Sequence, residues 1–395
     1  MPSDLPINPS AEGLPLVGVT VVEAGHSVAA PFAGAIFAQL GADVVKVEMP
    51  GRGDHTRDWG PPYRDGVAVI YQAFNRDKRS IVVDLSDEEE RNGLKSYILE
   101  EVDVVIQNLR PGVMEKYGLD SETLCTEKPS LIYCNLSAYG QTGPMRNRPG
   151  YDPLMQAFGG IMSVTGEEGR APVRVGTSIV DMGAGMWSVI GVLSALIARS
   201  NSGCGSVVDT SLYETAIGWM TPVFGTFMAS GDIPKRLGSA AAQIVPYEVF
   251  ETADGYLMIA AGSDGLFERL SKVLAKAEWA VDEKYATNGA RVVNRHLLVP
   301  MIAEIVKTKA TSYWEDALNA AQVPNAPLQN AKEVTENEQT KALGIIQTIG
   351  DQECSLIGLP LSFNGMRPAF RKQPPKLGED TDRVLKFRSK TSSKK

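Results

Sequence analysis

Cysteine and histidine are scarce in this sequence, and their spacing argues against two common kinds of site. The 395 residues include four cysteines and three histidines. The cysteines form no Cys-x-x-Cys pair and are scattered, at Cys125, Cys134, Cys204 and Cys354. We therefore expect no zinc or other metal centre, and a reducing, cytoplasmic compartment rather than a disulfide framework.

Basic excess and long apolar runs are also missing. Asp and Glu outnumber Lys and Arg by 47 to 39, for a net charge of −8, which argues against a nucleic-acid partner. No apolar run crosses a bilayer length without interruption, so no membrane partner is expected. The polar N-terminus resembles neither a secretory signal nor a transit peptide. The final Ser-Lys-Lys does not match the peroxisomal tripeptide.

The Gly-x-Gly-x-x-Gly fingerprint is absent where a dinucleotide-binding fold would carry it. Residues 17–23 and 43–48 have the pattern of strands, and residues 31–40 between them have that of a helix. This βαβ order predicts an α/β fold with a parallel sheet. The intervening turn reads AGHSVAAPFAG, so a nicotinamide or flavin site has little support.

The remaining pattern divides the chain into a large and a small domain. Residues 14–224 have βα character, which predicts the first part of the large domain. A composition change then predicts a small α+β domain at 225–325, with a hairpin in the alternating stretch 246–261. Residues 326–388 return to the large domain, and 389–395 form a disordered tail.

Asp181 stands at the start of a nearly all-apolar stretch, 182–200, which predicts a mostly buried helix. An aspartate here is typical of a helix N-cap. It is equally compatible with a carboxylate nucleophile, since Gly183 and Gly185 would let a substrate approach the backbone. Backbone N–H groups there could hold an oxyanion. The local pattern leaves both interpretations open.

Several segments, in a fixed order along the chain, resemble the class III (family III) coenzyme A transferases. The resemblance extends over about residues 14–385. The segments that carry it are GADVVKVE at 41–48, PGRGD at 50–54, NRDKRS at 75–80, NLRPG at 108–112, YGQTGP at 139–144, GYD at 150–152 and the Asp181 segment.

The resemblance implies a nucleophile at Asp181 and a two-stage covalent mechanism. The carboxylate would attack an acyl-CoA to give a mixed anhydride, and the thiolate would then form an aspartyl-CoA thioester. Water must be excluded, because anhydrides hydrolyse. CoA thioester is thus a co-substrate, with no permanent cofactor. The family also implies an interlocked homodimer, with a Rossmann-like large domain built from both chain ends.

The same resemblance assigns residues to CoA. Val28 and Ala29 would lie near the thiol, whereas the nucleotide would be held by Arg76, Lys78, Arg79, Asn108 and Arg110. For Arg76, Lys78 and Arg79 the alternative is a solvated loop. Lys46 is expected at the outward rim of its strand.

For the acid substrate, the segments at 59–62 and 244–247 resemble the branch that uses succinyl-CoA and small dicarboxylates. A second carboxylate needs a cation, and the candidates are His26, Arg52 and Arg57, with Tyr151 nearby. For both arginines the alternative is surface pairing with Asp54 or Asp58.

Two other functions remain as alternatives. An α-methylacyl-CoA racemase of the same fold needs a His/Asp acid–base pair, but Tyr151 precedes Asp152 where such enzymes have histidine. A catalytically silent CoA-binding protein would bind CoA without exchanging it.

Overall fold

A six-stranded parallel sheet forms the centre of the first part of the chain in the computed structural model, which describes residues 7–8, 12–348 and 355–385. Every neighbouring pair is parallel. In spatial order the strands are β6 (Arg79–Val82), β3 (Asp43–Glu48), β2 (Thr20–Ala24), β7 (Val104–Gln107), β8 (Ile132–Ser137) and β9 (Val207–Ser211). Counted along the chain this is 3-2-1-4-5-6, the doubly wound order. The predicted α/β fold with a parallel sheet is confirmed.

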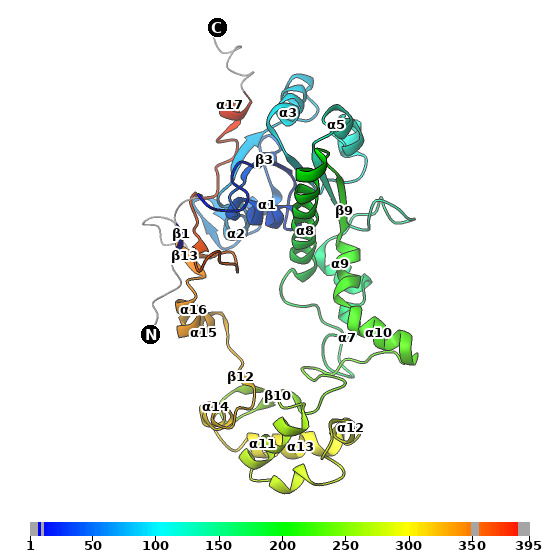
Figure 1. The fold of residues 1–395 in the computed structure, drawn as a ribbon, viewed down its shortest axis with the longest axis vertical. Coiled ribbons are helices and arrows are strands. Elements are labelled where there is room, and N and C mark those ends of the chain that lie inside the picture. The colour runs from blue at the N-terminus through cyan, green and yellow to red at the C-terminus, as the bar shows by residue number, and fades with distance from the viewer. Residues whose placement is uncertain (1–6, 9–11, 349–354, 386–395) are drawn as a thin grey trace. The chain divides into compact units, whose positions relative to one another are not determined.

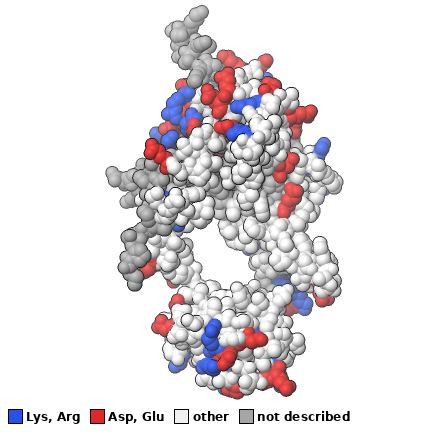
Figure 2. Space-filling view, in the orientation of Figure 1, with Lys and Arg blue, Asp and Glu red and all other residues white. Residues whose placement is uncertain are grey.

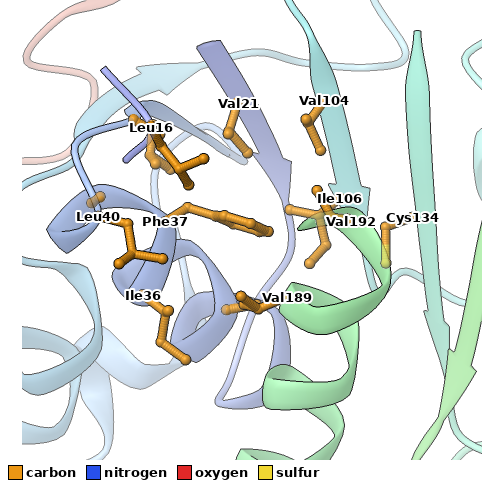
Figure 3. Packing of buried hydrophobic residues seen from close by; sticks show 14 of the residues in the cluster. Leu16, Val21, Ile36, Phe37, Leu40, Val104, Ile106, Cys134, Val189 and Val192 are labelled. Carbon is orange, nitrogen blue, oxygen red and sulfur yellow. The ribbon is translucent and has the colours of Figure 1, made fainter. Parts of the chain in front are cut away.

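Both faces of this sheet are covered, because its strands carry apolar residues at successive positions. Val21, Val104 and Cys134 face a core that includes α1 (Ala29–Gln39) and α8 (Ile179–Ser202). Figure 3 shows Phe37 of α1 reaching in among Val21 and the α8 residues. The alternate strand residues face a second core, which includes α3 (Glu88–Glu101) and α5 (Ser121–Glu127) (Figure 1).

Helix α8 is long and apolar enough to cross a membrane, and in the described part of the chain it is the one helix that passes this test. It packs instead along α1 and against β8 and β9. Its glycines permit this close packing: a Cβ on Gly185 would come within 2.7 Å of the Ala29 carbonyl oxygen. A Cβ on Gly183 would meet Trp219 at 2.8 Å. These glycines therefore serve helix packing, and the space beside them is filled by the protein.

A second compact unit consists of residues 162–173 and 229–336. Its antiparallel sheet joins β10 (Tyr247–Glu251), β11 (Tyr256–Ala260) and β12 (Asn325–Pro327). The hairpin predicted within 246–261 is confirmed, with Tyr247 opposite Ala260. The sheet shares a core with α11 (Asp264–Val273), α13 (Arg295–Val306) and α14 (Thr311–Ala320), and Val292 of the short helix α12 (Asn288–Val293) packs against it.

Residues 337–385 belong to the first unit, but none of their described strands joins the six-stranded sheet. They form small pairings, β13 (Ile346–Thr348) with β14 (Ser355–Ile357) and β1 (Ile7–Asn8) with β15 (Arg367–Pro368). Asp380 and Thr381 then accept backbone N–H groups of β6. The predicted tail at 389–395 lies outside the described residues.

The remaining elements complete the chain between those already described. They are η1 (His55–Asp58), β4 (Tyr63–Arg64), β5 (Val67–Ala68), α2 (Val69–Asn75), α4 (Val113–Lys116), α6 (Asp152–Phe158), α7 (Ile161–Val164), α9 (Leu212–Trp219), α10 (Thr221–Ser230), η2 (Ala277–Ala280), α15 (Ala331–Glu336), α16 (Glu338–Ala342) and α17 (Thr381–Val384).

Candidate active site

The chain reverses its winding direction between β2 and β7, and a cavity lies beyond the carboxyl ends of these strands. Open α/β sheets bind ligands at this position. The cavity has a volume of about 170 Å³. Its walls come from six parts of the first unit: residues 26–29, His55, residues 108–111, residues 136–138, residues 148–151, and Asp181 with Leu212.

Seven of the residues singled out from the sequence line this one cavity, although they are spread over 156 positions (181 − 26 + 1). They are the nucleophile candidate Asp181, the CoA candidates Val28, Ala29, Asn108 and Arg110, and the substrate candidates His26 and Tyr151. The sheet topology accounts for this, because the segments that follow β2, β7 and β8 all leave the same edge.

Asp181 is the third residue of α8, and Ser178 occupies the N-cap position. The N-cap interpretation is therefore wrong. Asp152, which begins α6, caps α8 instead: its Oδ2 accepts the N–H of Val180 at 2.7 Å and that of Asp181 at 3.1 Å. Its Oδ1 accepts Gln156 Nε2 at 2.5 Å. The Asp181 carboxylate itself has no hydrogen bond to a described side chain or backbone group, so it remains available at the cavity wall.

The surroundings of Asp181 raise the pKa of its carboxyl group. Burial, and next the negative charge of Asp152, raise the pKa of Asp181 to about 7. A carboxylate with a raised pKa is a stronger nucleophile once it is ionised, and perturbed carboxyls of this kind are typical of active sites. The role of Asp152 was not evident from the sequence, because it depends on α6 lying against the start of α8.

The loop after β2 is fixed in place by two hydrogen bonds to one side chain. Asn108 Oδ1 accepts the N–H of His26 at 3.0 Å, and its Nδ2 donates to the His26 carbonyl at 2.9 Å. Ser27 adopts a left-handed φ of 69°, and its N–H donates to Asp54 at 3.1 Å. Helix α1 then starts at Ala29 without a side-chain cap. Asn108 thus both lines the cavity and holds the opposite wall.

His26 and His55 stack with their ring centroids 5.0 Å apart, and both line the cavity. Burial lowers the pKa of His26, although Asp54 opposes the shift. His26 is consequently uncharged at neutral pH. His55 was not among the predicted site residues, since a lone histidine in the charged loop 50–57 carries no distinguishing pattern.

Lys46, expected at a strand rim, and Lys78, expected at the CoA nucleotide, are both completely buried. Lys46 bridges Glu23 at 2.7 Å and Asp54 at 2.8 Å, so its expected position at a strand rim is wrong. Lys78 donates to the other oxygen of Glu23 at 2.6 Å and to Asn75 at 2.9 Å. Neither lysine reaches the cavity. Together they neutralise carboxylates beneath the loop that carries His26.

The other four predicted arginines also lie away from this cavity. Arg57 makes a two-pronged pair with Glu48, at 2.7 and 2.8 Å, and is buried. Arg52 pairs with Asp58 at 3.1 Å on the surface. Arg79 pairs with Asp43, at the amino end of the sheet. Arg76 is buried against the Phe370 ring and donates to the Ile357 carbonyl at 2.9 Å. Arg57 and Lys78 thus have buried structural partners, which differ from the surface pairing supposed for Arg57 and from the solvated loop supposed for Lys78.

A second cavity of about 350 Å³ adjoins the first, and His26 and Leu109 line both. Its walls are mostly apolar and come from the ends of β2, β3, β6 and β7, and from α4, with Val83, Leu94, Met114 and Leu119 among the lining residues. In the described part of the chain, no three His, Cys, Asp or Glu side chains gather in a way that could hold a metal ion.

Comparison with known proteins identifies the group to which this arrangement belongs. The model of CoA-transferase family III matches residues 16–381. The chain belongs to CoA-transferase family III. It is 37% identical over 385 residues to a succinate–glutarate CoA-transferase of Agrobacterium fabrum, covering 94% of this chain and 95% of that protein.

Two further relatives extend the comparison of this family III CoA-transferase. The succinyl-CoA:glutarate CoA-transferase of Homo sapiens is 33% identical over 379 residues, or 94% of this chain and 85% of that one. The crystal structure of a CAIB/BAIF family protein from Brucella suis superposes with a TM-score of 0.83 at 39% identity, covering 95% and 99% of the two chains. Enzymes of this family use CoA thioesters as co-substrates.

Charge on the face shown in Figure 2 gives no second indication of a binding region. Acidic and basic side chains are interspersed over the face shown in Figure 2. Mixed charge of this kind differs from the basic stripe of a nucleic-acid surface. The site is therefore defined by the cavity at the sheet edge and by the residues that line it.

Proposed function

We propose that this family III CoA-transferase moves CoA from succinyl-CoA to a small dicarboxylic acid such as glutarate, with Asp181 as the covalent nucleophile. The relatives named for succinate and glutarate support the substrate class. The observation that carries the mechanism is the Asp181 carboxylate, which lines a cavity at the sheet edge while Asp152 performs the capping that Asp181 would otherwise supply.

The chemistry needs no metal and no external base. An Asp181 oxygen attacks the thioester carbonyl, the C–S bond breaks, and CoA thiolate leaves, which gives an aspartyl–succinyl mixed anhydride. The thiolate then attacks the aspartyl carbonyl, and succinate leaves with the C–O electron pair. The acceptor carboxylate attacks the resulting aspartyl-CoA thioester, the C–S bond breaks, and the thiolate leaves. The thiolate then attacks the acceptor acyl carbon of the new anhydride, and the Asp181 carboxylate leaves with the C–O electron pair, which regenerates the enzyme. Each stage exchanges one activated acyl group for another.

The two adjoining cavities suggest how CoA lies. Since His26 and Leu109 line both, an extended pantetheine arm can pass from the Asp181 cavity into the apolar one. Apolar walls suit an adenine ring. Arg110 follows Leu109 directly and lines the first cavity, so its guanidinium is placed to bind a CoA phosphate. In this arrangement the thioester carbon lies beside Asp181.

The homodimer belongs to the same proposal. Large apolar side chains are exposed on α8, among them Trp187, Ile190 and Ile197. Exposed apolar patches of this kind mark protein interfaces. A second copy of the chain, interlocked with the first, is the partner that the family resemblance implies.

The deciding experiment is intact-mass analysis after mixing the enzyme with succinyl-CoA. We expect a CoA-sized adduct that hydroxylamine or borohydride traps at Asp181. Asp181→Ala should form no adduct, whereas Asp316→Ala, which changes an exposed aspartate of α14, should form it normally. An unmodified wild-type protein that still binds CoA would support the silent binder. Exchange of the α-proton of a 2-methylacyl-CoA without an adduct would support the racemase.

A further inference from the structure

Arg148, like Arg110, carries a guanidinium at the cavity wall that has no hydrogen bond or ion pair with any described residue. It is exposed and lines the same cavity as Asp181. We propose that Arg148 binds the distal carboxylate of the dicarboxylic acid and so selects dicarboxylic over monocarboxylic acids. This inference rests on the function proposed above and adds the residue that determines specificity.

The negative charge of a dicarboxylic acid must be balanced at the cavity. A dicarboxylate brings one carboxylate to the reacting centre beside Asp181 and carries a second that needs a cation. Arg52 and Arg57, the candidates that the sequence suggested, are already paired with Asp58 and Glu48 and do not line the cavity. The lining groups that can be positive are His26, His55, Arg110 and Arg148.

Two of these four are poorly suited to the role. Burial lowers the pKa of His26, so its ring carries no charge at neutral pH. His55 stacks on His26 rather than standing free. The two arginines keep their charge at any physiological pH and can grip a carboxylate with two parallel hydrogen bonds.

The position along the chain distinguishes Arg110 from Arg148. Arg110 adjoins Leu109, which also lines the apolar second cavity, and so belongs to the CoA side. Arg148 belongs to the wall formed by residues 148–151, four residues before Asp152. Because Asp152 holds the first turn of α8, the segment that presents Arg148 is anchored directly to the turn that presents Asp181. A cation at this position can select acids by length, because it binds the distal carboxylate only when the other carboxylate reaches Asp181.

Kinetics with two substrate pairs test this assignment in the full-length enzyme. For Arg148→Gln we expect kcat/KM with glutarate to fall by about 10- to 150-fold, the range typical of a lost charge-assisted hydrogen bond, mainly through a higher KM. Exchange between butyryl-CoA and butyrate, which have no second carboxylate, should stay within about twofold. Arg148→Lys should recover part of the glutarate activity. The matched control is Arg146→Gln, an exposed neighbour that does not line the cavity.

Other outcomes would overturn the assignment in recognisable ways. An equal loss for glutarate and butyrate would place Arg148 outside acid selection. A loss confined to CoA affinity, measured as weaker inhibition by added free CoA, would move Arg148 to the CoA phosphates. Formation of the Asp181 adduct from butyryl-CoA verifies that the variant is folded and competent. If the wild-type enzyme formed no adduct, the proposed function itself would fail, independently of Arg148.

Discussion

At the residue scale, the pair Asp152 and Asp181 shows how one carboxylate can be assigned to structure and another to chemistry. Asp152 is buried, and both of its carboxylate oxygens accept hydrogen bonds. Two of these bonds come from N–H groups in the first turn of α8. Asp181 lies within the same turn yet uses no oxygen for capping. The division leaves a carboxylate with a raised pKa facing the cavity. The sequence alone could not divide the roles, because either aspartate stands near a helix start.

The raised pKa of Asp181 predicts a pH-dependent first step. Only the ionised carboxylate attacks a thioester, and the pKa is raised to about 7, so the ionised fraction grows as pH rises through 7. The rate of adduct formation from succinyl-CoA should increase nearly tenfold per pH unit well below 7 and level off above pH 8.

Quenched-flow mass analysis between pH 5.5 and 8.5 measures this rate directly. A rate that stays constant over the whole range would contradict the raised pKa. The loss of succinyl-CoA without enzyme, measured over the same pH range, is the control.

At the element scale, α6 and α8 are joined by a cap that crosses between helices. Asp152→Ala should leave the N–H groups of Val180 and Asp181 without an acceptor, and we expect it to lower the free energy of unfolding by about 1–3 kcal/mol. It should also move the midpoint of the adduct-formation profile to lower pH, because a negative charge near Asp181 is lost.

Asp152→Asn serves as the matched variant for that measurement. Its amide oxygen can still accept an N–H group of α8, so it should retain more stability than Asp152→Ala while shifting the pH midpoint in the same direction. Urea unfolding and the pH profile together separate the two effects. An unshifted midpoint in both variants would show that the charge of Asp152 does not act on Asp181.

The elements also show how far the sequence predicts this protein. The first βαβ unit follows from local apolar patterns. The strand at 43–48 has its predicted bounds, whereas the strand predicted at 17–23 spans Thr20–Ala24 and the helix predicted at 31–40 spans Ala29–Gln39. The structural roles of Lys78 and Arg57 could not be predicted from such patterns. Their partners are Glu23 of β2 and Glu48 of β3, two neighbouring strands of the sheet. From the sequence alone, a basic residue near a binding loop is compatible with phosphate binding. Only the register of the sheet shows that a buried carboxylate lies opposite it.

The same reason explains which cavity residues were missed. His55 begins the short 3-10 helix η1 and Arg148 lies in a surface loop, and neither segment has a periodic pattern. Both residues reach the site because the segments that leave the carboxyl edge of the sheet meet at its switch point. Residues 26–29 and Asn108 directly follow β2 and β7, and for them the predicted end of a strand already indicated the site.

At the scale of the whole molecule, the apolar side chains left exposed on α8 need a partner. Trp187, Ile190 and Ile197 are 47%, 49% and 68% exposed, at helical positions that share one face. The buried face of the same helix already packs on the sheet and α1. We therefore expect the exposed face to be covered by a second copy of the chain.

Sedimentation velocity at micromolar concentration should give the mass of two chains for the wild-type enzyme. Ile190→Glu places a charge in the middle of this face. Burial in an interface would leave that charge without a partner, so the variant should sediment mainly as a monomer. Val281→Glu, at an 80% exposed position of the second unit, is the control and should remain dimeric. Circular dichroism at low temperature verifies that both variants are folded. A wild-type monomer, or an Ile190→Glu dimer of unchanged affinity, would show that the exposed face of α8 does not mediate self-association.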